Sequence, residues 1–228
     1  MPSPVELSQR FMRLQTGDLC NTLDVMGEQT QMLDLRIKPL RRGMKCAGIA
    51  VTWNAVLACH DPLPRDSKAV KSWRHVTDFV APGTVFVYQP GGEMSSGHLG
   101  SMYGTMISTR GAAGAVVDGN LRDSDGHEQL PDWSVFSRGT SPLEAASRIK
   151  WLEPNTPILM SGELQRWIKV VPGDMILADG DGVMVVPQKL IMPVLKKAEK
   201  VADAEEKAQK AYAAGGDPEE VAKKYGAA

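Results

Sequence analysis

The sequence predicts a mixed α/β fold in a single domain, followed by a helical tail. Three observations support this prediction. Apolar runs of strand length alternate with stretches of helical periodicity over the first two thirds of the chain. Short β runs separated by turn residues follow, and after Pro187 the composition shifts to Ala, Glu and Lys, which are strong helix formers. The length of 228 residues suits one domain with an appendage.

The first fifty residues predict two helices and a buried strand. Ser3 is a suitable N-cap, and Pro4 suits a first helical turn. The residues 16–18 break the first helical pattern, and Gly27 ends the second. The predicted elements are a helix from Ser3 to about Leu14, a helix from Leu19 to Met26, and a strand from Lys45 to Trp53.

The middle of the chain predicts alternating helices and strands. The expected elements are a helix from Ser67 to about Val80, a strand over Thr84–Tyr88, a helix over Gly100–Arg110 and a strand over Ala115–Val117. A glycine-rich polar segment spans residues 89–100, and the loop 118–123 follows the last of these strands. This alternation favours an α/β domain with some parallel pairing. In such sheets, ligands bind at the loops that follow the carboxyl ends of strands.

The last third predicts antiparallel strands. The expected strands are Trp167–Val171, Met175–Ala178 and Val183–Val186. The turn residues 172–174 and 179–182 separate them. Asp179 and Asp181 resemble a metal motif, but the twelve-residue calcium loop and its terminal glutamate are missing, so we interpret them as hairpin-turn residues.

The chain is predicted to end in two helices. An apolar face extends from Leu190 to Ala202, residues 215–217 stop this helix, and a short helix follows over Pro218–Tyr225. We expect a core over residues 1–190 and a tail over residues 191–228. An amphipathic tail of this kind is suited to packing on a neighbouring subunit, and packing on its own core is equally allowed.

Composition excludes several classes of partner. Hydrophobic residues make up 43% and charged residues 23%, which is ordinary globular composition. The formal net charge of -1 does not indicate binding to nucleic acid or to an anionic membrane. The three cysteines form no CxxC pair, and we expect reduced thiols. The first residues lack the features of a signal peptide, and no apolar run approaches the ~18 residues of a membrane span. We therefore expect a cytoplasmic protein.

The block from Gly91 to Gly126 contains the residues best suited to chemistry. Its glycine-rich loop leads into a helix, whose free backbone N–H groups suit a carboxylate or enolate oxygen. One strand later, Arg122 and Asp123 stand side by side. The arginine suits an anionic substrate and the carboxylate suits a divalent metal. The alternative is a local ion pair that caps a turn. No dinucleotide-binding fingerprint and no P-loop is present.

The run RGAAGAVVDGNLRD at 110–123, together with GDMILADGDGVMVVP at 173–187, resembles a known family. This family contains 4-hydroxy-4-methyl-2-oxoglutarate aldolase and the regulator of ribonuclease activity A, and its members have often been mislabelled as menaquinone methyltransferases. The resemblance extends from about Gly17 to the early C-terminal helix. It implies a swivelling β/β/α domain, assembled as a homotrimer or homohexamer, with active sites between subunits.

The resemblance also implies an activity. The family's aldolases depend on a divalent metal, Mg²⁺ or Mn²⁺, release pyruvate from a 4-hydroxy-2-oxo acid and decarboxylate oxaloacetate. By this resemblance, Asp123 is the metal-binding aspartate and Arg122 contacts the small 2-oxo acid substrate. The implied helix-start substrate site consists of Gly100, Ser101, Met102 and Tyr103. A further metal ligand is expected from the tail of the adjacent subunit, and the best match is Glu205, with Glu206 and Glu199 as alternatives.

One residue departs from the family's pattern. The family's catalytic members usually carry Asp or Glu directly after the glycine that matches Gly100, whereas this chain has Ser101. Glu93 and His98 in the preceding loop are candidates to replace that carboxylate. The alternative is that no residue replaces it. Besides the lyase, two alternatives therefore stay open: an enzyme of altered reaction, and a non-catalytic protein that binds a partner protein as the ribonuclease regulator does.

Overall fold

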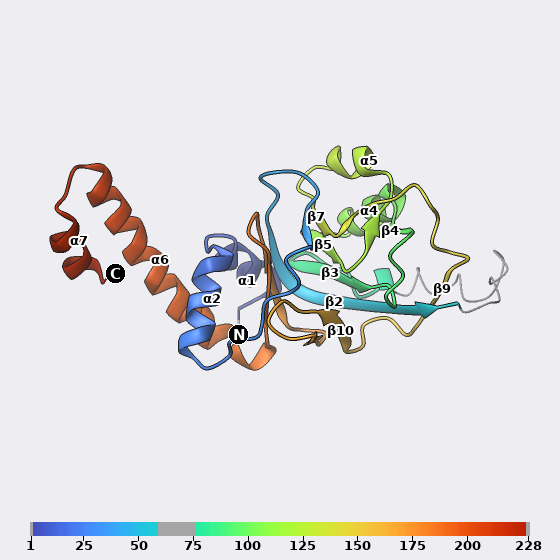
Figure 1. The fold of residues 1–228 in the computed structure, drawn as a ribbon, viewed down its shortest axis with the longest axis horizontal. Helices are drawn as coiled ribbons and strands as arrows, with labels where there is room; N and C mark the ends of the chain where they lie inside the picture. Colours follow the sequence, from blue (N-terminus) through green and yellow to red (C-terminus); the bar gives the residue numbers. More distant parts are fainter. Residues whose placement is uncertain (1, 59–75, 227–228) are drawn as a thin grey trace.

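The computed structural model describes residues 2–58 and 76–226. A curled sheet of eight strands forms the centre, and helices cover both of its sides (Figure 1). The predicted mixed α/β fold is therefore confirmed. The helix expected from Ser67 lies mostly outside the described residues, as does Cys59. Within the described ranges, no helix has both the length and the apolar character that a membrane crossing requires.

Parallel pairing dominates the middle of the large sheet. Its parallel strands, in spatial order, are β7 (Ser134–Ser137), β5 (Gly114–Val117), β3 (Thr84–Gln89) and β2 (Cys46–Leu57). Antiparallel strands complete it: β1 (Lys38–Pro39) beside β7, β12 (Met175–Ala178) and β13 (Val183–Val186) beyond β2, and β9 (Ile149–Trp151) on the end of β2. The predicted parallel pairing is thus present.

Two smaller sheets accompany the large one. The parallel three-stranded sheet contains β4 (Gly97–Leu99), β6 (Asn120–Leu121) and β8 (Gly139–Thr140). The antiparallel two-stranded sheet contains β10 (Ile158–Ser161) and β11 (Trp167–Val170). The described helices are α1 (Pro4–Phe11), α2 (Thr16–Val25), α4 (Ser101–Ser108), α5 (Ser124–Glu128), the 3₁₀ turn η2 (Gln188–Leu190), α6 (Ile191–Ala213) and α7 (Pro218–Tyr225).

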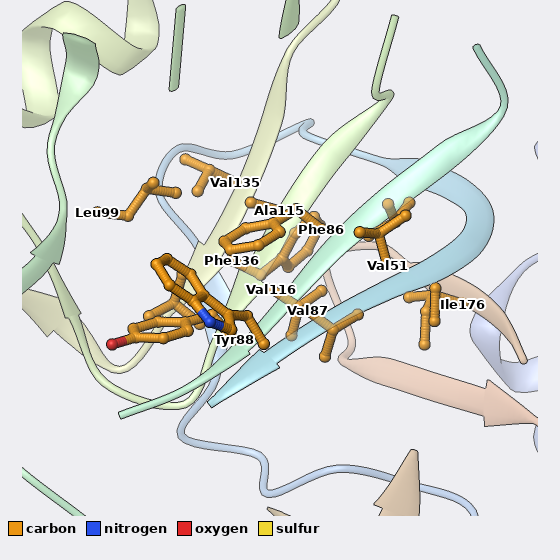
Figure 2. Packing of buried hydrophobic residues seen from close by; sticks show 14 of the residues in the cluster. Val51, Phe86, Val87, Tyr88, Leu99, Ala115, Val116, Val135, Phe136 and Ile176 are labelled. Carbon is orange, nitrogen blue, oxygen red and sulfur yellow. The ribbon is translucent and has the colours of Figure 1, made fainter. Parts of the chain in front are cut away.

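The side chains of the sheet divide into two apolar cores. In β12, Ile176 belongs to one core and its neighbour Leu177 to the other, as the alternation of a strand requires. The larger core packs the parallel strands, and Figure 2 shows Phe86, Val116 and Phe136 within it. The smaller core joins β12 and β13 to α1, α2 and the first turns of α6. Both faces of the sheet are therefore buried.

The predicted N-terminal elements are confirmed with one correction. Ser3 caps α1 by accepting a hydrogen bond from the backbone N–H of Glu6. The second helix begins at Thr16 and not at Leu19. Asp179, far along the chain, accepts hydrogen bonds from the backbone N–H of Thr16 at 2.8 Å and from its hydroxyl at 2.7 Å. Because this partner comes from a distant hairpin, residues 16–18 start the helix instead of breaking it.

The C-terminal third also differs from the prediction in one pairing. β12 and β13 form the expected antiparallel hairpin, and Asp179 accepts a hydrogen bond from the backbone N–H of Asp181 within its turn. The turn at 172–174 does not join paired strands, however, because β11 pairs with β10. Its Asp174 instead accepts from the backbone N–H groups of Val171 and Gln188. The turn signal was correct, but the strand that pairs with β11 precedes it in sequence.

A buried ion network ties the small β10–β11 sheet to the large sheet. The Arg138 guanidinium donates to Asp118 at 2.6 Å and to Asp34 at 3.1 Å. Asp118 also accepts from the backbone N–H of Ser161, at the end of β10, at 2.8 Å. Arg36 reaches the same Asp34 from the surface. Since Asp118 begins the loop that contains Arg122 and Asp123, this network supports the base of that loop.

We predict that Arg138→Met destabilises the protein by about 3–5 kcal/mol, because it leaves two buried carboxylates without their shared cation. Urea unfolding followed by circular dichroism would measure the change. Arg36→Met is the matched control, because it removes the exposed cation from the same Asp34 and is expected to have a much smaller effect. Equal effects of the two substitutions would contradict this account.

Acid should weaken the same network. The hydrogen bonds of Arg36, and after them the Arg138 guanidinium, hold the pKa of Asp34 well below its ordinary value, although burial opposes the shift. A carboxyl with a lowered folded-state pKa contributes stability above its unfolded-state pKa of about 4, and this contribution is lost as the pH falls. The stability difference between wild type and Asp34→Asn should therefore shrink between pH 7 and pH 3 in urea titrations. A stability difference that does not change with pH would contradict this account of Asp34.

Candidate functional site

The candidate functional site lies where the carboxyl ends of three parallel strands meet. Each of β3, β5 and β7 is followed by one strand of the small parallel sheet: β4, β6 and β8 respectively. Two of these short strands lead directly into helices, β4 into α4 and β6 into α5. The N-termini of α4 and α5 are thereby brought to the same edge, as the predicted alternation of strands and helices required.

Asp123 links the two helices. It occupies the N-cap position of α5 with φ 59° and ψ 50°, a left-handed conformation that is uncommon for a residue other than glycine. Its carboxylate makes no capping bond to α5 and instead accepts from the backbone N–H of Ser101, at the start of α4, at 3.3 Å. Arg122 lies beside it, with Nε 3.5 Å from Asp123 Oδ1. The Arg122–Asp123 ion pair of the alternative interpretation is therefore present. The Asp123 carboxylate does not cap its own helix, however, and instead accepts a hydrogen bond from the first turn of α4.

These residues open onto a cleft of about 660 Å³, which we call the Asp123 cleft. Its lining residues are Ser101, Arg122, Asp123, Ser124, Asp125, Gly126, Thr140, Ser141 and Pro142. The side chains of Arg122 and Asp123 are 33% and 45% exposed, so both are accessible to a ligand. Arg122 is the one cation among the lining residues. Glu144 lies on its other side, with Oε1 3.9 Å from Arg122 Nη1.

The predicted helix-start residues divide between two cavities that share Arg122 as a lining residue. Gly100 is the N-cap of α4, and Ser101 lines the Asp123 cleft. Met102 is 70% exposed. Tyr103 and Gly100 line a separate cavity, which Arg122 also lines. The first-turn N–H groups of a helix have no partner within it, and here the Ser101 N–H finds its partner in the Asp123 carboxylate.

Two glycines allow α4 and α5 to approach closely. A Cβ on Gly104 would lie 2.6 Å from the ring of His127, and one on Gly126 would lie 2.6 Å from Ser101 Cβ. The His127 ring is held by its neighbours, because Trp133 Nε1 donates to its Nδ1 at 3.2 Å and its Nε2 therefore donates to the carbonyl of Leu99 at 3.1 Å. Burial lowers the pKa of His127, which agrees with a neutral, structural ring.

The separate cavity has a volume of about 60 Å³, and we call it the His98 cavity. Its lining residues are Gly97, His98, Gly100, Tyr103, Arg122, Glu144, Ala145, Ala146 and Trp151. Glu93, predicted as a possible replacement for the carboxylate missing at Ser101, is only 7% exposed and accepts from the backbone N–H groups of Ser95 and Ser96. Neither Glu93 nor His98 lines the Asp123 cleft.

Sequence reasoning overlooked the contribution of β8 and the residues after it. Thr140, Ser141 and Glu144 reach the site because β8 pairs with β6. The strand β7 that precedes them contains only four residues, and no motif marks the segment. The only available signal was positional, since this segment follows a third strand in the alternating part of the chain.

The donor set offers oxygen ligands for a hard divalent cation. Asp123 and Asp125 supply carboxylates, and Mg²⁺ is usually bound by one or two carboxylates together with water and substrate oxygens. Within residues 2–58 and 76–226, no three His, Cys, Asp or Glu side chains gather closely enough to hold a metal ion by themselves. The residues therefore fit a cation that relies on other oxygens, and they do not form a complete protein cage.

The three tail glutamates differ in their surroundings. Glu199 is bound bidentately by Arg10 at 2.6 and 2.8 Å, and Glu206 pairs with Lys210. Glu205 faces Asp18 of α2; burial and this neighbouring carboxyl raise its pKa. In Figure 1, α6 extends from the body on the side away from α4 and α5. Within one chain, Glu205 is not brought to the Asp123 cleft.

Comparisons with known proteins agree on one family. The family model described as RraA-like, Aldolase/RraA, matches residues 16–185. A Halalkalibacterium halodurans protein named "Putative 4-hydroxy-4-methyl-2-oxoglutarate aldolase" is 34% identical over 196 residues, which are 86% of this chain and 83% of that protein. Protein DlpA of Legionella pneumophila is 26% identical over 221 residues, 96% of this chain; the match covers only 34% of DlpA, about a third of its length.

A solved structure extends the likeness to the fold. Streptomyces coelicolor RraAS2, an unusual member of the RNase ES inhibitor RraA protein family, superposes with a TM-score of 0.75 and 26% identity. The match covers 91% of this chain and 97% of that one. The expected fold class is confirmed by this likeness.

We predict that Gly104→Ala destabilises the protein by about 1–3 kcal/mol, because the added methyl group meets a ring that two hydrogen bonds hold in place. Gly17→Ala is the matched control: it lies in α2 with nothing within 4 Å of the added Cβ, and should be neutral or stabilising by up to about 1 kcal/mol. Thermal unfolding of both variants would test this. A Gly104→Ala variant as stable as wild type would show that α4 and α5 are not in close contact.

Proposed function

This chain belongs to the Aldolase/RraA family, and from that premise we propose that it is a carbon–carbon lyase acting on small 2-oxo acids. The reaction would be aldol cleavage that releases pyruvate from a 4-hydroxy-2-oxo acid, decarboxylation of an oxaloacetate-like acid, or both. The observation that carries the proposal is the convergence of the Arg122 guanidinium, the Asp123 carboxylate and the N-terminus of α4 at one accessible cleft.

Arg122 and the start of α4 supply fixed positive potential. In both reactions a carbon–carbon bond breaks and its electrons form an enolate, whose charge gathers on the 2-oxo oxygen. Arg122 would bind the substrate's carboxylate in a bidentate way. At the start of α4, where the Ser101 N–H already donates to Asp123, the Met102 N–H would donate to the oxygen on which charge develops. Both groups are set in place by the fold before substrate arrives.

Asp123 is the residue that would hold a divalent cation, with Mg²⁺ or Mn²⁺ as the expected ion. When bound, such a cation would supply Lewis-acid stabilisation of the enolate. The Asp123 carboxylate is suited to this role because it is accessible and faces the same cleft as Arg122. The serine at position 101 contributes a hydroxyl where the family's catalytic members usually have a carboxylate, so we expect weaker cation binding than in those relatives.

The tail would complete the site in an oligomer. We propose that the core over residues 1–190 carries the cleft, that the tail over residues 191–228 packs on a neighbouring subunit, and that the assembly is a homotrimer or homohexamer. Glu205 is favoured as the tail's ligand because Glu199 and Glu206 are paired within their own chain. The α6–α7 hairpin projects from the body, as Figure 1 shows, which suits such a contact.

A second candidate is a non-catalytic protein that binds a partner protein. Ser101 favours it, since a catalytic carboxylate is missing at the start of α4. The relative RraAS2 belongs to a family of RNase ES inhibitors. The accessible Arg122–Asp123 pair favours the lyase, because a purely partner-binding protein has no need for an anion site beside a carboxylate in a cleft.

We predict that the protein releases pyruvate from oxaloacetate or from 4-hydroxy-4-methyl-2-oxoglutarate when Mg²⁺ or Mn²⁺ is present, and that excess chelator stops the release. Asp123→Asn should abolish the metal-dependent rate, and Arg122→Lys should lower kcat/KM by roughly 10²-fold, because lysine cannot hold the substrate's carboxylate in a bidentate way and the substrate is misplaced. A coupled lactate dehydrogenase assay would measure pyruvate.

Glu128→Gln provides the control, because this carboxylate is also on α5 but does not line the Asp123 cleft. It should leave both rates unchanged. If well-folded wild type turns over neither substrate, the lyase is excluded for them and the partner-binding candidate is favoured.

A further inference from the structure

The His98 cavity contains a buried ring nitrogen that lacks a partner. His98 is 4% exposed, and among the residues that the structure describes, its Nδ1 has no hydrogen-bond partner. The other edge of the ring is covered, because Nε2 lies 2.7 Å from the carbonyl oxygen of Glu93 and Cδ2 packs against Gly119. The Nδ1 edge is therefore the one left to face the cavity that His98 lines together with Arg122.

The partners of Nε2 determine what Nδ1 can do. Both are acceptors: the Glu93 carbonyl, and the Glu93 carboxylate with Oε2 at 3.1 Å. Nε2 must therefore carry the proton, and in a neutral ring Nδ1 has a free lone pair. Burial lowers the pKa of His98, so the ring is neutral near pH 7. The cavity thus presents a hydrogen-bond acceptor and calls for a ligand group with a proton to donate.

The other walls define that group further. Ala145 and Ala146 are small, Trp151 and Tyr103 are aromatic, and the Glu144 carboxylate disfavours a second anion. A volume of about 60 Å³ accepts a hydroxyl on a small carbon group and not a whole substrate. Since Arg122 also lines the Asp123 cleft, a 2-oxo acid bound at Arg122 could place its next carbons in this cavity. An alcohol group satisfies all of these conditions.

We propose that His98 Nδ1 is the base that accepts the proton of the substrate's 4-hydroxyl group during aldol cleavage. This inference rests on the proposed lyase function and deepens it, because it names the substrate class as 4-hydroxy-2-oxo acids. The hydroxyl-bearing carbon of the substrate is assigned to the His98 cavity, and its 2-oxo acid group is assigned to the Asp123 cleft.

The step balances without a further reactant. The O–H bond breaks and its proton moves to Nδ1, while the oxygen's electrons form the carbonyl of the leaving product. The C3–C4 bond breaks, and its electron pair becomes the enolate of pyruvate. The proton on Nδ1 then returns to C3, which gives pyruvate and the second carbonyl product and restores neutral His98.

Glu93 is the positioning residue of this arrangement. The backbone N–H groups of Ser95 and Ser96 and the Ser95 hydroxyl donate to its carboxylate. Although burial alone would raise the pKa of Glu93, these hydrogen bonds outweigh burial and lower it, so the group stays ionised. A carboxylate beside Nε2–H fixes the tautomer and stabilises the imidazolium that forms.

The test compares two reactions of the same holoenzyme, loaded with Mg²⁺. Cleavage of 4-hydroxy-2-oxopentanoate, a 4-hydroxy-2-oxo acid without a carboxylate on C4, needs a base for the hydroxyl, whereas decarboxylation of oxaloacetate does not. We expect His98→Gln to lower kcat for cleavage by about 10²–10⁴ and to change decarboxylation by less than about threefold. Gln retains a donor toward the Glu93 carbonyl. Ala146→Val, which narrows the cavity and leaves the Glu93 and His98 side chains in the protein, should show the same selective loss.

Tyr88→Phe is the control. Its ring packs against His98 with centroids 6.0 Å apart, but Tyr88 does not line the His98 cavity. The ratio of the two rates should stay at the wild-type value in this variant. Equal loss of both reactions in His98→Gln and Ala146→Val, or full cleavage activity in both, would overturn the assignment. If wild type decarboxylates oxaloacetate but does not cleave the aldol substrate, only the assignment of His98 is overturned. If wild type catalyses neither reaction, the proposed lyase function is overturned as well.

Discussion

The parallel alignment of β3, β5 and β7 is the constraint on which the site depends. Parallel strands bring all their carboxyl ends to one edge, and each of these three strands then adds a short strand to a second sheet above that edge. Residues separated by tens of positions, such as Ser101, Asp123 and Thr140, become neighbours in this way. The buried Arg138 network underneath holds Asp118, where the loop to Asp123 begins.

The charges around Arg122 indicate that an anionic ligand would bind there only together with an additional positive charge. The Arg122 guanidinium lies near both Asp123 and Glu144, and Asp125 lines the same cleft. A dianionic acid would meet more negative than positive charge there. A divalent cation at Asp123 would raise the positive charge at the cleft from one to three and would thereby favour the binding of an anionic acid.

Much of the fold was predictable because its strongest signals are local. The apolar runs of β3, β12 and β13 and the Ser3 cap of α1 depend only on neighbouring residues, and the adjacency of Arg122 and Asp123 after a strand marked the site. What could not be predicted depends on distant contacts. The start of α2 is set by Asp179, β11 pairs with a strand that precedes it, and Glu144 reaches Arg122 through a two-residue strand. The partnerless Nδ1 of His98 likewise becomes visible only in three dimensions.

The glycine contacts between α4 and α5 bear on how the site can move. Gly104 against His127 and Gly126 against Ser101 leave no space for one helix to slide past the other. We therefore expect the two helices to move together as one body, with the start of α4 at a fixed distance from Asp123. Any movement that closes the Asp123 cleft over a bound molecule would then involve elements outside this body, such as the segment around Ser141 or another chain. The protein would then close around a ligand through the residues at the rim of the cleft, while the floor stays unchanged.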